Sequence, residues 1–229
     1  MNIFENKNII LVGNAPGLSI TEIVDQNSFF SPSDFFVTFN RLSPLNQASV
    51  WGCGQILPDD YFSQEFILYD KNTNPTPPNC KNSFGYDAEM YQGENPDPAQ
   101  QWITDLIHEI DNTIPLSGLI AIKFFLMQPI KSLYIFNFDF YLRQDKNEEY
   151  YLPFNDDSHR LWPQREWLKK IKLRQRDNIW HPPHKIFFDD ILHEVLDNNY
   201  PQEKIEYSFK AILGVVQIIM KPLGVADEL

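Results

Sequence analysis

The segment Asn8-Ile-Ile-Leu-Val-Gly-Asn-Ala-Pro-Gly17 decides the expected fold of this chain. Residues 8–12 are rich in β-branched side chains, which predicts a short buried strand. Gly13 to Gly17 form a turn, and residues 18–25 are expected to continue as a helix. A strand that passes through a Gly/Pro turn into a helix is the opening of a nucleotide-binding α/β fold. Glycine lets the backbone approach a phosphate there, and helix N-terminal N–H groups favour negative charge.

Further along the chain, apolar runs that end in polar residues predict more elements. Strands are expected at residues 34–39, 65–69 and 132–138, and helices at 99–111, 119–127 and 188–196. The first two of these strands end at Asn40 and Asp70, and the third, the most apolar, ends in Asp139-Phe-Tyr141. Open α/β sheets bind ligands outside the carboxyl ends of their strands. We therefore expect one Rossmann-like α/β domain over residues 1–229, with a mostly parallel sheet flanked by helices.

Two segments carry no clear strand or helix pattern. Residues 71–100 are rich in proline and turn-forming residues, which predicts an irregular excursion. Residues 143–178 are charged and aromatic without a clear period, and seven of the 19 basic residues fall between Arg160 and Arg176. Such a basic run is either a solvated helix face or a cationic flap over an anionic ligand. We expect residues 143–181 to form a lid.

Composition narrows the classes of function. The chain has 229 residues and a net charge of -12, which disfavours a general nucleic-acid binder because both would be anionic. Two cysteines cannot build a disulfide framework or a four-thiolate zinc site. The apolar run at the start is too short for a signal peptide or a membrane span, so a cytoplasmic location is expected. A last strand is expected at residues 205–209, and whether the apolar tail at 211–220 contacts the inner membrane peripherally stays open.

Several residues at the expected strand ends have side chains suited to a nucleotide or sugar ligand. The Asn40 amide can both donate to and accept from hydroxyl groups. Ser117-Gly118 precedes the buried helix, where serine is either a helix cap or a hydroxyl offered to a carboxylate or phosphate. A turn or a cap explains each of these residues equally well when it is considered alone.

Tyrosine and histidine residues supply candidates for proton chemistry. Tyr141, Tyr150 and Tyr151 carry hydroxyls that can donate to a leaving phosphate, although packed rings are the plainer explanation. The chain lacks an H-E-x-x-H zinc motif, so the sequence implies no metal. His184 stands five positions before Asp189 at an expected helix start, where a neutral imidazole could take a proton from a sugar hydroxyl.

Four segments in one order resemble a known family. They are Ile9-Ile-Leu-Val-Gly-Asn-Ala-Pro-Gly-Leu18, Phe35-Phe-Val-Thr-Phe-Asn-Arg41, Pro115-Leu-Ser-Gly118 with its apolar run to Asn137-Phe-Asp-Phe-Tyr141, and His184-Lys-Ile-Phe-Phe-Asp189. Together they resemble the bacterial lipooligosaccharide sialyltransferases and, more remotely, the sialylmotifs of animal sialyltransferases. The resemblance implies a metal-independent, inverting glycosyltransferase. Such an enzyme transfers a sugar from a CMP-sugar donor to a hydroxyl of a bacterial surface glycan and needs no cofactor besides that donor.

The resemblance also implies roles for individual residues. Asn14 and Asn40 would hold the nucleotide and sugar of the donor, while Ser117 and Gly118 would meet its carboxylate or phosphate. The remaining donor-binding candidates are Gly13 and Asp70.

The catalytic roles implied by the resemblance fall on tyrosine and histidine. Tyr141 and one of Tyr150 or Tyr151 would bind the departing phosphate. His184 would be the general base on the acceptor hydroxyl, with His181 as the second candidate.

The chain departs from the family at two points, and two other functions stay open. The family has an arginine shortly before Ser-Gly, where this chain has Asn112-Thr-Ile-Pro115, and an asparagine where this chain has Asp70. The opening segment also resembles pterin pyrophosphokinase-like proteins, whose Mg²⁺ would be held here by Asp70 and Asp139. A non-catalytic nucleotide- or glycan-binding module of the same fold is the third hypothesis, and the oligomeric state is open.

Overall fold

Short, buried apolar runs build a single seven-stranded sheet in the computed structural model. The structure describes residues 2–15, 17–31, 33–45, 47–52, 56–76, 78–87, 98–140, 161–177 and 184–198. The strands are β1 (Asn8–Val12), β2 (Phe35–Phe39), β3 (Ala48–Trp51), β4 (Phe66–Asp70), β5 (Ser83–Tyr86), β6 (Ser132–Phe136) and β7 (Lys185–Phe188). Every pairing is parallel and the order is β5-β4-β3-β2-β1-β6-β7. The predicted Rossmann-like α/β fold is confirmed, with a sheet that is wholly rather than mostly parallel.

The described residues also form five helices. They are α1 (Ile20–Gln26), α2 (Gln101–Glu109), α3 (Ser117–Leu126), α4 (Leu161–Arg176) and α5 (Asp190–Asp197). Their starts follow ordinary capping chemistry in two cases. Ser19 and Glu22 form a capping box at α1, and the Asp189 carboxylate accepts from the Leu192 N–H at α5. Short 3₁₀ turns lie at Tyr61–Ser63 and Pro98–Gln100.

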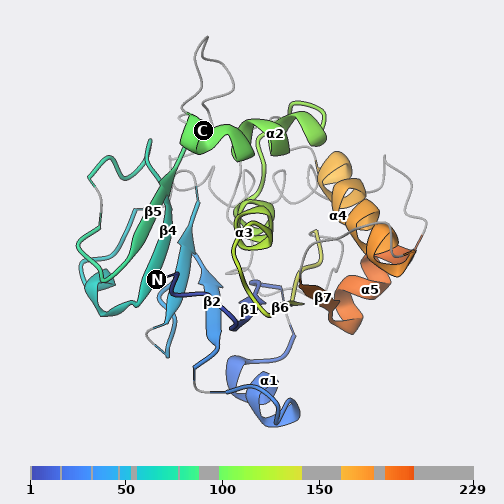
Figure 1. Cartoon of the computed structure of the whole chain (residues 1–229), viewed down its shortest axis with the longest axis horizontal. Helices are drawn as coiled ribbons and strands as arrows, with labels where there is room; N and C mark the ends of the chain where they lie inside the picture. Colours follow the sequence, from blue (N-terminus) through green and yellow to red (C-terminus); the bar gives the residue numbers. More distant parts are fainter. Residues whose placement is uncertain are drawn as a thin grey trace, which may run out of the picture.

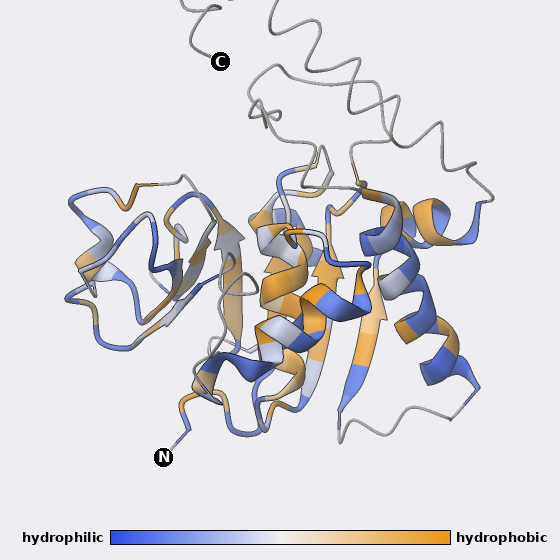
Figure 2. Ribbon diagram, turned by 90° about the horizontal axis from the view of Figure 1, so that it is seen from above, coloured by the Kyte–Doolittle hydropathy of each residue, from blue (hydrophilic) through white to orange (hydrophobic). Residues whose placement is uncertain are grey.

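The helices cover the two faces of the sheet unequally. Figure 1 shows α2, α3, α4 and α5 on one side of the strands and α1 on the other. The main core lies under the four helices, where Leu106, Phe125, Leu168 and Leu192, one from each, join the cluster that contains Leu11 of β1. Helix α3 is apolar along its length (Figure 2), as expected for a helix packed between the sheet and its neighbours.

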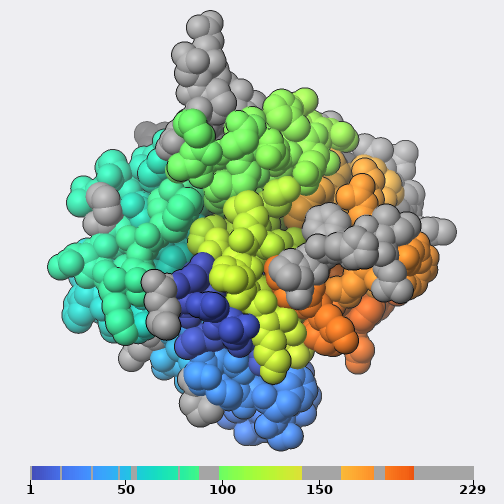
Figure 3. Space-filling view, viewed as in Figure 1, coloured from blue at the N-terminus to red at the C-terminus, as the bar shows by residue number. Residues whose placement is uncertain are grey.

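The N-terminal residues close one end of this core. The Asn6 N–H donates to the Pro129 carbonyl, and the Lys131 N–H donates to the Lys7 carbonyl. Figure 3 accordingly shows the dark blue start of the chain against the yellow-green segment before β6. These contacts lie at the amino edge of the sheet, where the strands begin.

The strand order places a topological switch point between β1 and β6. From β1 the chain moves outward through β2, β3, β4 and β5, and it then returns through α2 and α3 to β6 on the other side of β1. Connections therefore leave the carboxyl ends of β1 and β6 in opposite directions. Open parallel sheets bind ligands in the crevice that this divergence creates.

Helix α4 occupies part of the segment expected to be a lid. Its apolar side chains Trp167, Leu168 and Ile171 are buried in the main core, so this part is a core helix rather than a flap. Arg165 is fully buried and donates to the carbonyls of Val195 and Leu196 at the end of α5.

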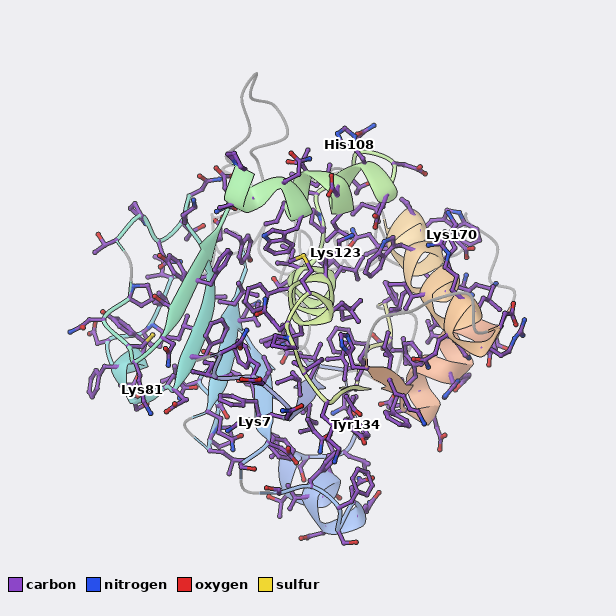
Figure 4. All side chains as sticks on the ribbon, viewed as in Figure 1. Lys7, Lys81, His108, Lys123, Tyr134 and Lys170 are labelled. Carbon is purple, nitrogen blue, oxygen red and sulfur yellow. The ribbon has the colours of Figure 1, made fainter. Side chains whose placement is uncertain are left out.

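The basic run in α4 is divided between the core and the surface. Lys170 points away from the body (Figure 4), whereas Arg165 is buried, so neither expectation for the run holds for all of its residues. The other residues of 143–181, with the strand expected at 205–209 and the tail at 211–220, lie outside the described residues. Among the described residues, no helix has the length and apolar character needed to cross a membrane.

Candidate functional site

Four neighbouring strands end at one edge of the sheet, and three of them bring predicted site residues to it. Gly13 and Asn14 follow β1, Asn40 follows β2, Gly52 follows β3, and Asp70 ends β4. Because all these strands are parallel, their carboxyl ends lie side by side. The edge is the one on which the switch point opens.

Asn137, directly after β6, holds the loop that follows β1. Its backbone is left-handed, with φ 59°, and its carbonyl accepts from the Ala15 N–H at 3.1 Å. Its side-chain Nδ2 donates to the Leu18 carbonyl at 2.8 Å. The loop packs so closely that a Cβ on Gly13 would lie 2.3 Å from the Asn137 carbonyl oxygen, so only glycine fits there. This role was not predicted, because residue 137 was expected to lie inside a strand over residues 132–138.

The amides of Asn14 and Asn40 are oriented by backbone partners. Asn14 Nδ2 donates to the Phe39 carbonyl at 3.2 Å, which ties the end of β1 to the end of β2, and Asn14 Oδ1 remains as an acceptor. Asn40 has φ 53°, and its Oδ1 accepts from the Gly52 N–H at 3.0 Å. Its Nδ2 has no hydrogen-bond partner among the described residues, so two N–H donors remain available.

Helix α3 begins beside Asn40, at the carboxyl edge. A Cβ on Gly52 would lie 2.0 Å from Ser117 Oγ and 3.6 Å from Asn40 Oδ1, so Asn40, Gly52 and Ser117 form one cluster. Ser117 is the first residue of α3 and not its cap. The cap position is Leu116, which provides no side-chain hydrogen bond to the helix. The positive end of the α3 dipole is therefore uncapped at this cluster.

Gly118 and the Ser117 side chain complete this end of α3. Gly118 packs against the ring of Phe138, and a Cβ there would lie 2.3 Å from that ring. Ser117 is partly exposed. Neither the Ser117 hydroxyl nor the N–H groups of Ser117 and Gly118 have a hydrogen-bond partner within the described ranges. These groups are donors that a ligand can use.

Asp70 is the acidic member of the edge. Its side chain is fully buried, and Oδ2 accepts from the Thr73 N–H at 3.0 Å and from the Thr73 hydroxyl at 2.8 Å. Oδ1 has no hydrogen-bond partner in the described part of the chain. An unpaired buried carboxylate oxygen is uncommon in a folded protein.

The structure separates His184 from these residues. His184 precedes β7, whose first residue, Lys185, pairs with Ser132 at the start of β6. His184 is thus at the amino edge, and its strand must run to Phe188 before it reaches the carboxyl edge. Five residues of extended chain span roughly 17 Å. The imidazole is buried, both ring nitrogens lack a partner among the described residues, and burial lowers its pKa. The expectation that His184 shares the donor site is therefore not met.

Asp189, five positions after His184, has a structural role at the opposite edge. Its Oδ2 accepts from the Asn137 N–H at 2.6 Å, while Oδ1 accepts from the Leu192 N–H at 2.8 Å and caps α5. Burial raises the pKa of this carboxyl group, and the two backbone N–H donors oppose that rise. Asp189 therefore holds Asn137, which in turn holds the loop after β1.

The remaining candidates cannot be placed. Tyr141, Tyr150, Tyr151 and His181 lie outside the described residues. Asp139 is buried just after β6. Within the described ranges, no three His, Cys, Asp or Glu side chains are grouped to hold a metal ion.

Comparison with protein-family models, with curated proteins and with solved structures gives no significant match for this chain. A functional assignment therefore rests on the fold and on the positions of these side chains. The carboxyl edge offers donors on Asn40, Ser117 and the start of α3, and acceptors on Asn14 and Asp70. Such an edge can bind a ligand that combines an anionic group with hydroxyl groups.

Proposed function

We propose that this chain is a metal-independent glycosyltransferase of the sialyltransferase type. It transfers a sugar, with inversion, from a CMP-sugar donor to a hydroxyl of a bacterial surface glycan. The observation that carries the proposal is the cluster of Asn40, Gly52 and Ser117 at the uncapped start of α3, beside the switch point of the sheet.

The phosphate of the donor binds at the start of α3. The free N–H groups of Ser117 and Gly118, the Ser117 hydroxyl and the Asn40 amide all donate toward an anion there, and the helix dipole favours the same charge. Arg41, the next residue after Asn40, has no acidic partner among the described side chains, so its positive charge also supports a phosphate nearby.

The hydroxyl groups of the donor require acceptors, which the same edge supplies. Asn14 is exposed, its Nδ2 donates to the Phe39 carbonyl, and its Oδ1 has no hydrogen-bond partner among the described residues. This fixed amide can accept from a ribose or sugar hydroxyl. The loop that carries it is held by Asn137, so the acceptor is preorganised before the ligand arrives.

Sugar transfer from a CMP-sugar needs only weak general-acid assistance at the leaving phosphate, but it needs a general base at the acceptor hydroxyl. The transition state resembles an oxocarbenium ion, and a phosphate monoester leaves readily when hydrogen-bond donors stabilise its charge. Tyr141, which directly follows the described residue Phe140, remains the proposed donor to that phosphate. A positioned base on the attacking hydroxyl contributes roughly 10²–10⁴-fold.

The strand order of the sheet leads us to propose a different base. His184 lies at the amino edge, whereas α4 begins at the carboxyl edge, where Gln164 accepts from the Leu116 N–H at 2.8 Å. His159 stands two positions before Leu161, the first residue of α4, and itself lies outside the described residues. We therefore propose His159 as the base in place of His184.

Isothermal titration with CMP in EDTA tests this proposal. We expect the wild type to bind CMP without added metal, and S117A and N40A to bind it at least tenfold more weakly. S132A is the matched control, because Ser132 is a buried serine at the opposite edge of the sheet. Absence of CMP binding, or binding of ATP only with Mg²⁺, would contradict the proposal, and the second result would support the pyrophosphokinase alternative.

A further inference from the structure

We propose that the apolar residues 211–220, the tail segment, pack over an exposed aromatic surface on β6 and β7. This surface, the aromatic face, consists of Phe29, Phe30, Tyr134 and Phe187. It lies on the side of the sheet that carries α1, whereas α3 lies on the other side (Figure 1). The inference is therefore independent of the proposed function.

The four rings of the aromatic face form one continuous cluster. Tyr134 and Phe187 are register neighbours on β6 and β7, and their rings stack with centroids 4.6 Å apart. The rings of Phe30 and Phe29 lie 4.8 Å and 5.7 Å from that of Tyr134. Phe29 is nevertheless 58% exposed and Phe187 41% exposed. Exposed apolar surface that is gathered in one place marks a site of contact.

The described elements leave this part of the sheet without a complete cover. Among the described helices, α1 alone lies on this side of the strands (Figure 1). Its buried residue Ile23 packs with Ile10 and Phe36 of β1 and β2. Helices α4 and α5, which flank β7 in the chain, both lie on the opposite side. Parallel sheets are normally covered on both faces, so a further segment is expected over β7.

The tail segment has the composition that such a cover needs. All of its residues are apolar except Gly214 and Gln217. It contains no charged residue, and Lys210 and Lys221 stand immediately on either side of it. Contact between this segment and the aromatic face would remove apolar surface from water on both partners.

The connection from α5 is long enough to bring the tail segment to the aromatic face. Helix α5 packs against β7, the outermost strand, and ends at Asp197. Residues 199–210 follow in the chain and can span roughly 40 Å when extended. Layers of a domain pack about 10 Å apart, so this connection can pass around β7 to the other side. Because the tail segment belongs to the same chain, its effective concentration at the face is high.

Charge favours the tail segment over two other occupants. Glu22 and Asp25 are exposed on α1, which borders the aromatic face, and neither forms an ion pair with a described side chain. These carboxylates complement Lys210 and Lys221, and they disfavour anionic lipid headgroups. The net charge of -12 makes two copies of the chain repel each other, which disfavours a second copy.

Hydrogen exchange of the full chain, measured by mass spectrometry, tests the inference. We expect the wild-type amides of residues 211–220 to exchange at least tenfold more slowly than in an unfolded chain. F29S/F187S should remove this protection and leave the amides of β1 protected, because both replaced side chains are exposed. F62S is the matched control, because Phe62 is 65% exposed but lies between β3 and β4, and it should change neither set of amides.

A second variant changes the tail segment instead of the aromatic face. Adjacent residues point in different directions in a strand and in a helix, so at least one of Val215 and Val216 is expected to meet the face. V215D/V216D should therefore expose the amides of residues 211–220 as F29S/F187S does, again with the amides of β1 protected.

Several results would overturn the inference. It is wrong if the wild-type tail segment exchanges like an unfolded chain, or if F29S/F187S leaves its protection unchanged. Sedimentation and flotation with phosphatidylglycerol vesicles identify the other two occupants. A dimer or vesicle binding that F29S/F187S abolishes would assign the aromatic face to a second copy or to a membrane, and either result would contradict the inference.

Discussion

The side chain of Gln175 forms two hydrogen bonds with the backbone of Ile186. Gln175 Nε2 donates to the Ile186 carbonyl at 2.7 Å, and the Ile186 N–H donates to Gln175 Oε1 at 2.7 Å. The amide of a helical residue thus replaces the strand that β7 lacks on its outer side. Gln100 does the same at β5, where it donates to the Gly85 carbonyl and accepts from the Asp87 N–H. These bonds satisfy backbone groups of the two outermost strands, which would otherwise be open to pairing with another chain.

Removal of the Gln175 amide should destabilise the fold. Q175A leaves two backbone groups of β7 without partners, so we expect a loss of about 1–3 kcal/mol in the free energy of unfolding. Urea unfolding measures this loss. Q101A is the control, because Gln101 is exposed and bonds only to the side chain of Asp105. Equal stability of the two variants would show that the edge bonds contribute nothing.

Replacement of Asn137 should lower both the stability of the loop that follows β1 and the affinity for CMP. Its φ of 59° suits glycine and asparagine but not alanine, so N137A should be about 1 kcal/mol less stable than N137G. Both variants lose the bond to the Leu18 carbonyl and should bind CMP more weakly. The control is N6A, which changes an asparagine of the same φ at the amino edge. Weakened CMP binding in N6A as well would refute a specific role for Asn137.

His184 should make the fold sensitive to acid. Burial lowers its pKa in the folded chain, while the unfolded chain keeps the ordinary value of about 6.5. Below that pH the unfolded state binds the proton more readily, so stability falls as the pH drops, by up to about 1.4 kcal/mol per unit. Urea unfolding at pH 7.5 and pH 5.5 should show a smaller difference for H184L than for the wild type. An identical difference in the two proteins would rule out this contribution.

Two of the three histidines considered as the base, His184 and His159, can be separated by transfer assays. Because β7 begins at the amino edge, H184A should keep the wild-type rate of sugar transfer per folded molecule. H159A should transfer the sugar roughly 10²–10⁴-fold more slowly and still bind CMP. H108A is the control, since His108 is exposed on α2 and points away from the body (Figure 4). Loss of transfer in H184A alone would return the role to His184.

The sequence predicted the parts of the fold that have a strong apolar pattern. Strands β1, β2, β4 and β6 and helices α1, α2, α3 and α5 correspond to expected elements, because each has an apolar pattern next to a turn. Strands β3, β5 and β7 were missed because each has four residues, with a polar residue in it. Helix α4 was missed because its many basic residues obscure the apolar spacing of its three core residues, Trp167, Leu168 and Ile171.

The recognised elements also determined which site residues were predicted correctly. Asn14, Asn40 and Ser117 were identified because they follow strands or precede a helix, and such positions are fixed by chain direction. His184 was misplaced because residues 185–188 were not recognised as a strand. A residue before a parallel strand lies at the amino edge, whereas one before a helix lies at the carboxyl edge. Because this one strand was not recognised, the imidazole was expected at the wrong edge of the sheet.

The most direct test of a nucleotide-sugar site at the carboxyl edge is a crystal structure of the chain with CMP bound. The account predicts that the phosphate accepts hydrogen bonds from the backbone N–H groups of Ser117 and Gly118 and from the Asn40 amide. CMP bound at the amino edge beside His184, or anywhere away from the start of α3, would contradict it.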